Sequence, residues 1–109
     1  MKTIKSSSEI SIIFKEGIRI HSQGIILIFS PIQTKEISVR SAFIAGKKNG
    51  NAVWRNKAKR RMRALFNELS FLFNDRDVIF LAKKNINKLN YNVLKDSLIK
   101  SLENNSNRI

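Results

Sequence analysis

The stretch NAVWRNKAKRRMRALF, residues 51–66, constrains the fold more than any other part of the chain. At the helical period of about 100° per residue, its apolar side chains fall within an arc of about 120°. They are Trp54, Ala58, Met62, Leu65 and Phe66, and Leu69 extends the same face. A helix of this kind is stabilised mainly by packing that face on another layer, so the rest of the chain must supply the layer.

The polar face of this helix carries positive charge only. Six of the nine residues from Arg55 to Arg63 are Lys or Arg, and no acidic residue lies between Glu36 and Glu68. Like-charged pairs at i,i+4 cost roughly 0.2–0.5 kcal/mol each, and cations near a helix N-terminus oppose the helix dipole. The sum is about 1–2 kcal/mol of local destabilisation, which indicates a functional surface rather than a merely soluble one.

The overall charge indicates the kind of partner. A formal net charge of +13 and an isoelectric point of about 10.7 favour a polyanion, with nucleic acid the first candidate and an anionic membrane surface the second. The longest apolar run, residues 25–29, is too short to span a bilayer, and the N-terminus lacks the apolar stretch of a secretory signal. The absence of cysteine fits a reducing compartment. We therefore expect a cytoplasmic protein without a membrane partner.

The length of 109 residues predicts a single domain, 1–109, with residues 104–109 as a frayed tail. Its first half begins with a short helix, where Ser6 and Glu9 have the spacing of a capping box and Gly17 is a natural stop. Ile10, Ile13 and Phe14 share one face of that helix. Residues 24–29 then predict a strand, 31–36 a turn and 37–45 a second strand. In this second strand Ile37, Val39, Phe43 and Ala45 face one way, and Ser38 and Arg40 the other.

The second half predicts a basic loop over 46–51, a long helix over 52–72 capped by Asn51, and a strand over 77–82. Asn90 caps a last helix, on which Tyr91, Leu94, Leu98 and Leu102 form an apolar stripe. The order α-β-β-α-β-α predicts an α+β two-layer sandwich, with a small, mostly antiparallel sheet and the helices on one face.

Polar residues near the start of the long helix extend the cationic surface. Lys47 and Lys48 precede Gly50 and Asn51, and loop amides at a helix start can bind phosphate; the alternative is a plain turn with two solvated lysines. Asn56 can donate to a phosphate or ribose and accept from a base edge, or it is an ordinary exposed asparagine. The order of residues in GKKNGN is not that of a P-loop.

The ordered motif GKKNGNAVWRNKAKRRMRALF resembles the signature of the protein subunit of bacterial ribonuclease P, Asn-Ala-Val-x-Arg-Asn-Arg-x-Lys-Arg-x-x-Arg after a basic loop. The similarity covers nearly the whole chain, including Phe14, Gly17, the strand DVIFLAKK and the closing LNYNVLKDSL. The resemblance implies a βαβ unit with a left-handed crossover, whereas general rules predict a right-handed one.

The same resemblance implies a function. In that family a separate catalytic RNA subunit hydrolyses one phosphodiester of precursor tRNA, which releases the 5′ leader and the mature 5′ end. The protein binds the catalytic RNA through the basic helix and loop, and it binds the single-stranded leader between the first helix and the sheet. Partners would be the catalytic RNA and precursor tRNA, with one protein per RNA. Mg²⁺ would be bound mainly by the RNA subunit.

Carried over residue by residue, the resemblance implies two sets of site residues. Lys57 stands where the family usually has Arg, so bidentate phosphate binding is weakened there. Ile10 and Ile28 occupy positions that are aromatic in some members, so base stacking of about 1–3 kcal/mol per base is reduced. The alternative role for Phe14 is a core aromatic. The RNA-binding set is Lys47, Lys48, Asn51, Arg55, Asn56, Lys57, Lys59, Arg60, Arg61 and Arg63, in which Arg61 is included for its place on the polar side of the helix and not for a match to the motif. The leader-binding set is Ile10, Phe14, Ile28, Lys83 and Tyr91.

Catalytic side chains are scarce in the sequence. His21 is the one histidine and has no cysteine or second histidine with which to share a metal. Asp75 and Asp77 are the only close acidic pair, and they bracket Arg76 as turn residues do. We therefore expect no protein catalytic residue and no protein metal site. Two alternatives stay open: a structural RNA-binding protein such as a small ribosomal protein, and a protein-only nuclease.

Overall fold

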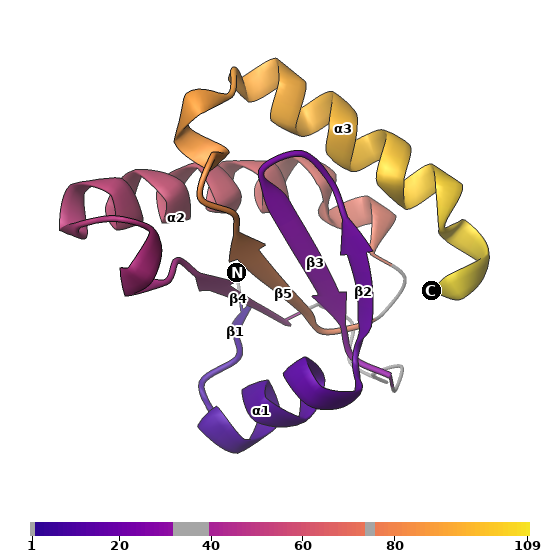
Figure 1. The fold of residues 1–109 in the computed structure, drawn as a ribbon. Helices are drawn as coiled ribbons and strands as arrows, with labels where there is room; N and C mark the ends of the chain where they lie inside the picture. The colour runs from indigo at the N-terminus through magenta and orange to yellow at the C-terminus, as the bar shows by residue number, and fades with distance from the viewer. Residues whose placement is uncertain (1, 32–39, 74–75) are drawn as a thin grey trace.

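The computed structural model describes residues 2–31, 40–73 and 76–109, which form a five-stranded sheet with helices on both sides (Figure 1). The strand order is β1-β4-β5-β3-β2. The strands are β1 (Lys2–Thr3), β2 (Ile18–His21), β3 (Ile25–Phe29), β4 (Arg40–Ile44) and β5 (Val78–Ala82). The helices are α1 (Ser7–Glu16), α2 (Ala52–Leu69) and α3 (Tyr91–Asn104), with 3-10 turns at Lys47–Asn49, Ser70–Leu72, Ile86–Lys88 and Ser106–Arg108.

The sheet is mixed, which corrects the expectation of a mostly antiparallel one. β1 pairs with β4 and β4 with β5 in parallel, whereas β3 pairs antiparallel with both β5 and β2. The long connection through α2 permits the parallel pairing of β4 and β5, because parallel neighbours need a crossover of about a dozen residues or more. The α+β class is confirmed, and the handedness of the β4–α2–β5 crossover stays a prediction.

Helices cover both faces of the sheet, so the expectation of helices on one face was wrong. Leu27, Phe29 and Phe80 belong to a cluster with residues of α2 and α3, whereas Ile28 and Ile79 belong to a separate cluster with Ile13 of α1. Successive strand residues point to opposite faces. Continuous apolar runs such as IILIF and VIFLA are typical of strands buried on both sides.

The larger core lies between the sheet and the pair α2 and α3. The predicted apolar face of α2 is confirmed, since five of its six residues are buried and Trp54 packs against the cluster. Leu94, Leu98 and Leu102 of α3 are buried as predicted. Phe66 and Phe73 stack with ring centroids 5.7 Å apart, and Phe80 meets both rings edge-on. This core fixes which side of α2 faces outward.

Local signals placed most helix ends correctly. Asn51 Oδ1 accepts from the Trp54 N–H at 3.0 Å, Asn90 Oδ1 accepts from the Asn92 N–H at 2.8 Å, and Gly17 follows α1. The long helix ends at Leu69 and tightens into a 3-10 turn over 70–72, where we expected α-helix. The two-residue β1 and the four-residue β2 were missed.

Some expectations fall wholly or partly outside the described residues: the turn over 31–36, apart from Pro31, and the first part of the strand over 37–45. Within that strand, Phe43 and Ala45 join the α2 side of the sheet, as predicted from the alternation. None of the helices in the described part of the chain is long and apolar enough to cross a membrane.

Candidate RNA interface

The outward side of α2 and the loop before it form a surface that we call the cationic ridge. Its members are Lys47, Lys48, Arg55, Lys57, Lys59, Arg60 and Arg63. Arg55 and Lys59 are half-buried and the other five are exposed. Across the described residues, no carboxylate forms an ion pair with any of them. The ridge therefore presents its charge unneutralised to solvent, in the form that binds a polyanion.

Two features hold the ridge in place. Arg63 lies over the ring of Phe43, with its guanidinium carbon 5.6 Å from the ring centroid. At the start of α2, Gly50 lies so close to Trp54 that a Cβ there would come within 2.5 Å of the indole. A side chain at residue 50 would therefore force the indole or the loop to move. Asn51 and Asn56 are both exposed beside these cations.

Arg61 is the exception in the predicted RNA-binding set. Its guanidinium donates to the carbonyl oxygens of Ile86 and Leu89, both at 2.6 Å. Burial lowers the pKa of Arg61, and the nearby Tyr91 partly opposes that shift. These contacts turn the side chain inward, toward the loop before α3, so Arg61 serves this connection rather than the open surface.

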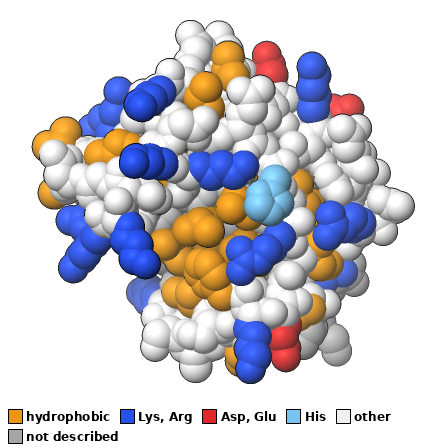
Figure 2. Space-filling view, viewed as in Figure 1, with side chains coloured by type: hydrophobic (Ala, Val, Ile, Leu, Met, Phe, Trp, Pro, Cys, Tyr) orange, Lys and Arg blue, Asp and Glu red, His pale blue; other side chains and the backbone are white. Residues whose placement is uncertain are grey.

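A second surface lies on the opposite face of the sheet, beside α1. Ile26 of β3, Leu81 of β5 and Ile44 of β4 are paired in register, which places the three side chains in one row across the sheet. We call them the apolar row. Each is only partly buried against the α1 cluster. Figure 2 shows apolar side chains gathered near the centre of this view, with Lys and Arg side chains around them. A surface of this type suits unpaired bases flanked by phosphates.

The predicted leader-binding residues do not all meet at this surface. Ile10 and Phe14 of α1 are half-buried at its edge, against the same cluster. Ile28 is fully buried beneath α1, because it pairs with Ile79 one row further along the sheet, and it offers no open surface. Ile26, two residues earlier in β3, points to the same face of the sheet and is only partly buried.

The other two members of the set lie elsewhere. Lys83 follows β5 and donates through Nζ to the Ser22 carbonyl at 2.7 Å. Tyr91 lies on the opposite side of the sheet, packed on the larger core, and its hydroxyl donates to Glu68 Oε1 at 2.9 Å. Desolvation, followed by that hydrogen bond, raises the pKa of Tyr91 to about 12. The tyrosine therefore joins α3 to α2 and is separated from the apolar row by the sheet.

Arg19 lies beside Phe14, one of the predicted leader-binding residues, and the sequence did not reveal this position. Its guanidinium lies 5.5 Å from the centroid of the Phe14 ring and donates to the Phe14 carbonyl at 2.9 Å. Arg19 itself is exposed. A cation therefore lies beside the Phe14 ring, an arrangement that favours a base stacked on the ring with its phosphate near Arg19.

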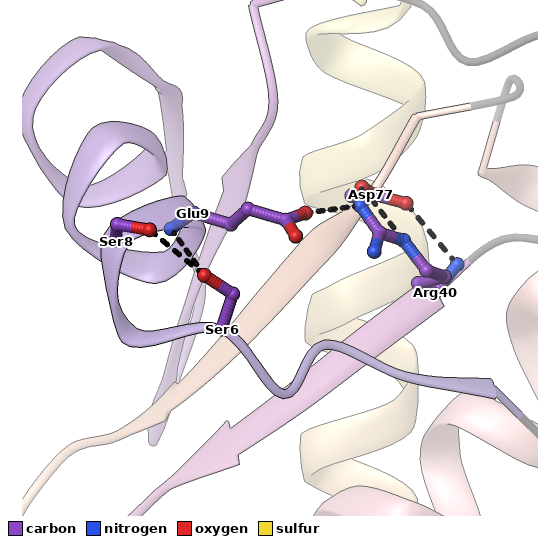
Figure 3. Close-up of polar contacts among 5 residues, drawn as sticks. All are labelled: Ser6, Ser8, Glu9, Arg40 and Asp77. Carbon is purple, nitrogen blue, oxygen red and sulfur yellow. Dashed lines mark hydrogen bonds and ion pairs between the residues drawn. The ribbon is translucent and has the colours of Figure 1, made fainter.

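An ion-pair network fixes α1 on the sheet. Arg40 of β4 donates to Asp77 Oδ2 at 2.6 Å and to Glu9 Oε2 at 2.5 Å (Figure 3). Its backbone N–H donates to Asp77 Oδ1 at 3.3 Å. The hydrogen bonds with Asp77 and then Glu9 raise the pKa of Arg40 well above its usual value. Only half of the predicted capping box forms, because Ser6 Oγ accepts from the Glu9 N–H while the Glu9 carboxylate turns to Arg40.

Metal-binding chemistry has little support from the side chains. Within residues 2–31, 40–73 and 76–109, no three His, Asp or Glu side chains gather as metal ligands would. Asp77 is bound to Arg40. His21 of β2 pairs with Ile26 of β3, so it lies next to the apolar row.

The sequence indicates only part of the apolar row. Ile26, Ile44 and Leu81 all lie in strands that were predicted correctly, and a two-residue period places each with a buried neighbour on the α1 face. What was missing was the register between strands far apart in the chain, together with the knowledge that α1 covers only part of that face.

Comparison with known proteins agrees with this geometry. Residues 1–105 match the model of the family described as Ribonuclease P. The chain is 33% identical to the ribonuclease P protein component of Acholeplasma laidlawii over 92% of its own length and 85% of that protein. It is 31% identical to the corresponding protein of Nitratiruptor, over 94% of this chain and 91% of that one.

Solved structures show the same fold. The RNase P protein of Staphylococcus aureus superposes with a TM-score of 0.77 at 27% identity, covering 94% of each chain. The RNase P protein from Thermotoga maritima superposes with a TM-score of 0.78 at 18% identity, covering 95% of this chain and 97% of that one; at this identity the likeness shows the fold alone.

Proposed function

This chain belongs to the family of ribonuclease P protein components, and from that premise we propose that its cationic ridge binds the catalytic RNA while its apolar row receives the 5′ leader of precursor tRNA. As a ribonuclease P subunit it takes part in tRNA 5′ processing within an endoribonuclease complex, and RNA is its partner in that ribonucleoprotein. The observation that carries the proposal is the ridge, whose cations form no ion pair with any carboxylate of the described residues.

The ridge suits an RNA backbone for electrostatic reasons. Side chains that repel one another in the free protein become charge-assisted donors once phosphates lie between them. Arg60 and Arg63 offer planar forks to phosphate oxygens, whereas Lys57 contributes a point charge. The buried apolar face holds α2 at a fixed orientation, so the side of the helix that carries the donors faces outward before RNA arrives.

The leader side suits a single strand. Phe14 gives one stacking surface, and the apolar row gives an aliphatic floor on which bases of any kind can lie. Arg19 lies at this edge, where it can bind a phosphate of the same strand. Because the floor is aliphatic, we propose a loose preference among leader bases.

We assign bond cleavage to the RNA subunit. Among the described residues, no three His, Asp or Glu side chains gather as metal ligands would, which is compatible with this assignment. Mg²⁺ would be held mainly by the RNA, and we derive no protein ligand for it. The ridge would aid the ion indirectly, because it reduces repulsion among the phosphates that the ion must otherwise screen.

Cleavage of precursor tRNA at low magnesium tests the proposal. The catalytic RNA is assayed with and without the protein, and the protein is also assayed alone. We expect the protein to stimulate the RNA and to show no activity by itself. No stimulation would favour a structural RNA-binding protein, and activity of the RNA-free protein would favour a protein-only nuclease.

A further inference from the structure

A second acid-free cationic segment lies beside α2. No Asp or Glu occurs from residue 78 to residue 95, and this span contains a connection that we call the lysine loop, residues 83–89, with Lys83, Lys84 and Lys88. Lys84 and Lys88 are exposed. In the described part of the chain, neither has a carboxylate partner. The loop thus has the charge character of the ridge, although it belongs to a different part of the sequence.

The lysine loop is fixed to α2 at several points. Arg61 donates to the Ile86 and Leu89 carbonyls at 2.6 Å, and Asn87 Nδ2 donates to the Trp54 carbonyl at 3.0 Å. Ile86 is fully buried in the larger core. These contacts hold the loop against the same helix that carries the ridge.

Electrostatics alone would not favour this arrangement. The Arg61 hydrogen bonds partly bury a guanidinium against neutral carbonyl oxygens. They also hold the loop with the exposed Lys84 and Lys88 against a helix that already has six cations in nine residues. Glu68, two turns along α2 from Arg61, does not relieve the repulsion, because it binds Lys95 at 2.7 Å and Tyr91. Like charges concentrated without internal compensation point to an external anion.

We propose that the lysine loop is a further RNA-binding surface, on which Lys84 and Lys88 bind backbone phosphates of the catalytic RNA, and that Arg61 is its positioning residue. The inference rests on the proposed function. It assigns the loop to the catalytic RNA rather than to the leader, because Arg61 and Asn87 join the loop to the ridge helix and not to α1. The RNA contact would then extend from the ridge across the loop.

The salt dependence of binding to the catalytic RNA tests the role of the lysines. The slope of log affinity against log salt is negative, and each phosphate contact contributes roughly 0.7–0.9 to its magnitude, which is called the slope below. The double variant Lys84→Ala/Lys88→Ala should reduce this magnitude by about 1.4–1.8. The matched control is Lys15→Ala/Lys100→Ala, which removes two exposed lysines from α1 and α3 and should leave the slope near the wild-type value. A slope unchanged in the loop variant, or lowered equally in both, would overturn the inference.

Arg60→Ala, measured in the same series, separates this inference from the proposed function. If Arg60→Ala lowers the slope and the loop variant does not, only the lysine loop fails. If neither variant changes it, the proposed use of the ridge fails as well.

Arg61→Lys tests the positioning role. Lysine keeps the charge but lacks the planar fork that reaches two carbonyl oxygens. If Arg61 positions the loop, Arg61→Lys should lower the slope, and adding it to Lys84→Ala/Lys88→Ala should lower it little further. A wild-type slope for folded Arg61→Lys would overturn the positioning role of Arg61. Circular dichroism verifies that each variant is folded. If Arg61→Lys is unfolded, the Lys84→Ala/Lys88→Ala variant still tests RNA binding by the loop, because both lysines are exposed.

Discussion

The carboxylate of Glu9 in α1 bonds to the guanidinium of Arg40 on β4, which joins a helix to the sheet on the side of the apolar row. Asp77, nearly buried, binds the same guanidinium, whereas Glu9 is about half exposed. The two carboxylates should therefore contribute unequally to stability.

Arg40→Ala should cost about 1–3 kcal/mol of unfolding free energy, because it leaves the Asp77 carboxylate buried without its partner. Glu9→Gln, the control, should cost less than about 1 kcal/mol, since an exposed pair contributes little. Urea denaturation of both variants measures the difference. Equal losses would show that burial of Asp77 is not what makes Arg40 important.

Gly50→Ala should disturb the start of α2. A Cβ at this position would come within 2.5 Å of Trp54, so the indole or the loop must move, at a cost of about 1–3 kcal/mol. Gly46→Ala is the matched control in the same loop, because the nearest atom to its Cβ would be 4.0 Å away. Thermal unfolding and RNA affinity should both fall for Gly50→Ala only. Similar behaviour of the two variants would argue against a close approach at residue 50.

Tyr91 should titrate late. It is the only tyrosine, so its phenolate absorbance reports on it alone. The midpoint should lie near pH 12 in the folded protein and near 10 in urea. A pKa raised on folding means that the stabilisation is complete below pH 10 and is lost as the pH rises toward 12. The stability difference between wild type and Tyr91→Phe should change over that window. A folded midpoint near 10 would contradict the burial of the Tyr91 side chain together with its contact to Glu68.

Phe14→Ala should reduce discrimination between precursor and mature tRNA. Losing one stacked base costs about 1–3 kcal/mol, which is roughly a 5- to 150-fold loss of preference for the precursor. Binding of the catalytic RNA should change far less. Ile12→Ala is the control, since Ile12 lies on the exposed side of α1. Equal losses for both RNAs would mean that Phe14 serves folding.

Local features of this fold could be predicted from the sequence because they depend on near neighbours. The apolar face of α2, the caps at Asn51 and Asn90, and the stop at Gly17 all follow from side chains within a few residues of one another. The outward direction of Arg60 and Arg63 followed from the same periodicity.

Long-range features could not be predicted in this way. Arg61 has the same helical spacing as its neighbours, but its donors bind a loop some 25 residues further along the chain. Ile28 and Ile26 are alike in sequence terms, and only the position of α1 makes one buried and the other accessible. Tyr91 was assigned to the leader-binding set from the resemblance. In the structure it packs on the larger core, on the face of the sheet opposite α1.

The salt dependence of catalytic-RNA binding by Arg60→Ala and Arg63→Ala is the most direct test of the claim that the cationic ridge binds RNA phosphates. Each variant should make the negative slope of log affinity against log salt shallower by about 0.7–0.9 relative to wild type, with the fold retained. Slopes equal to that of the wild-type protein would place both side chains away from the RNA and contradict the account.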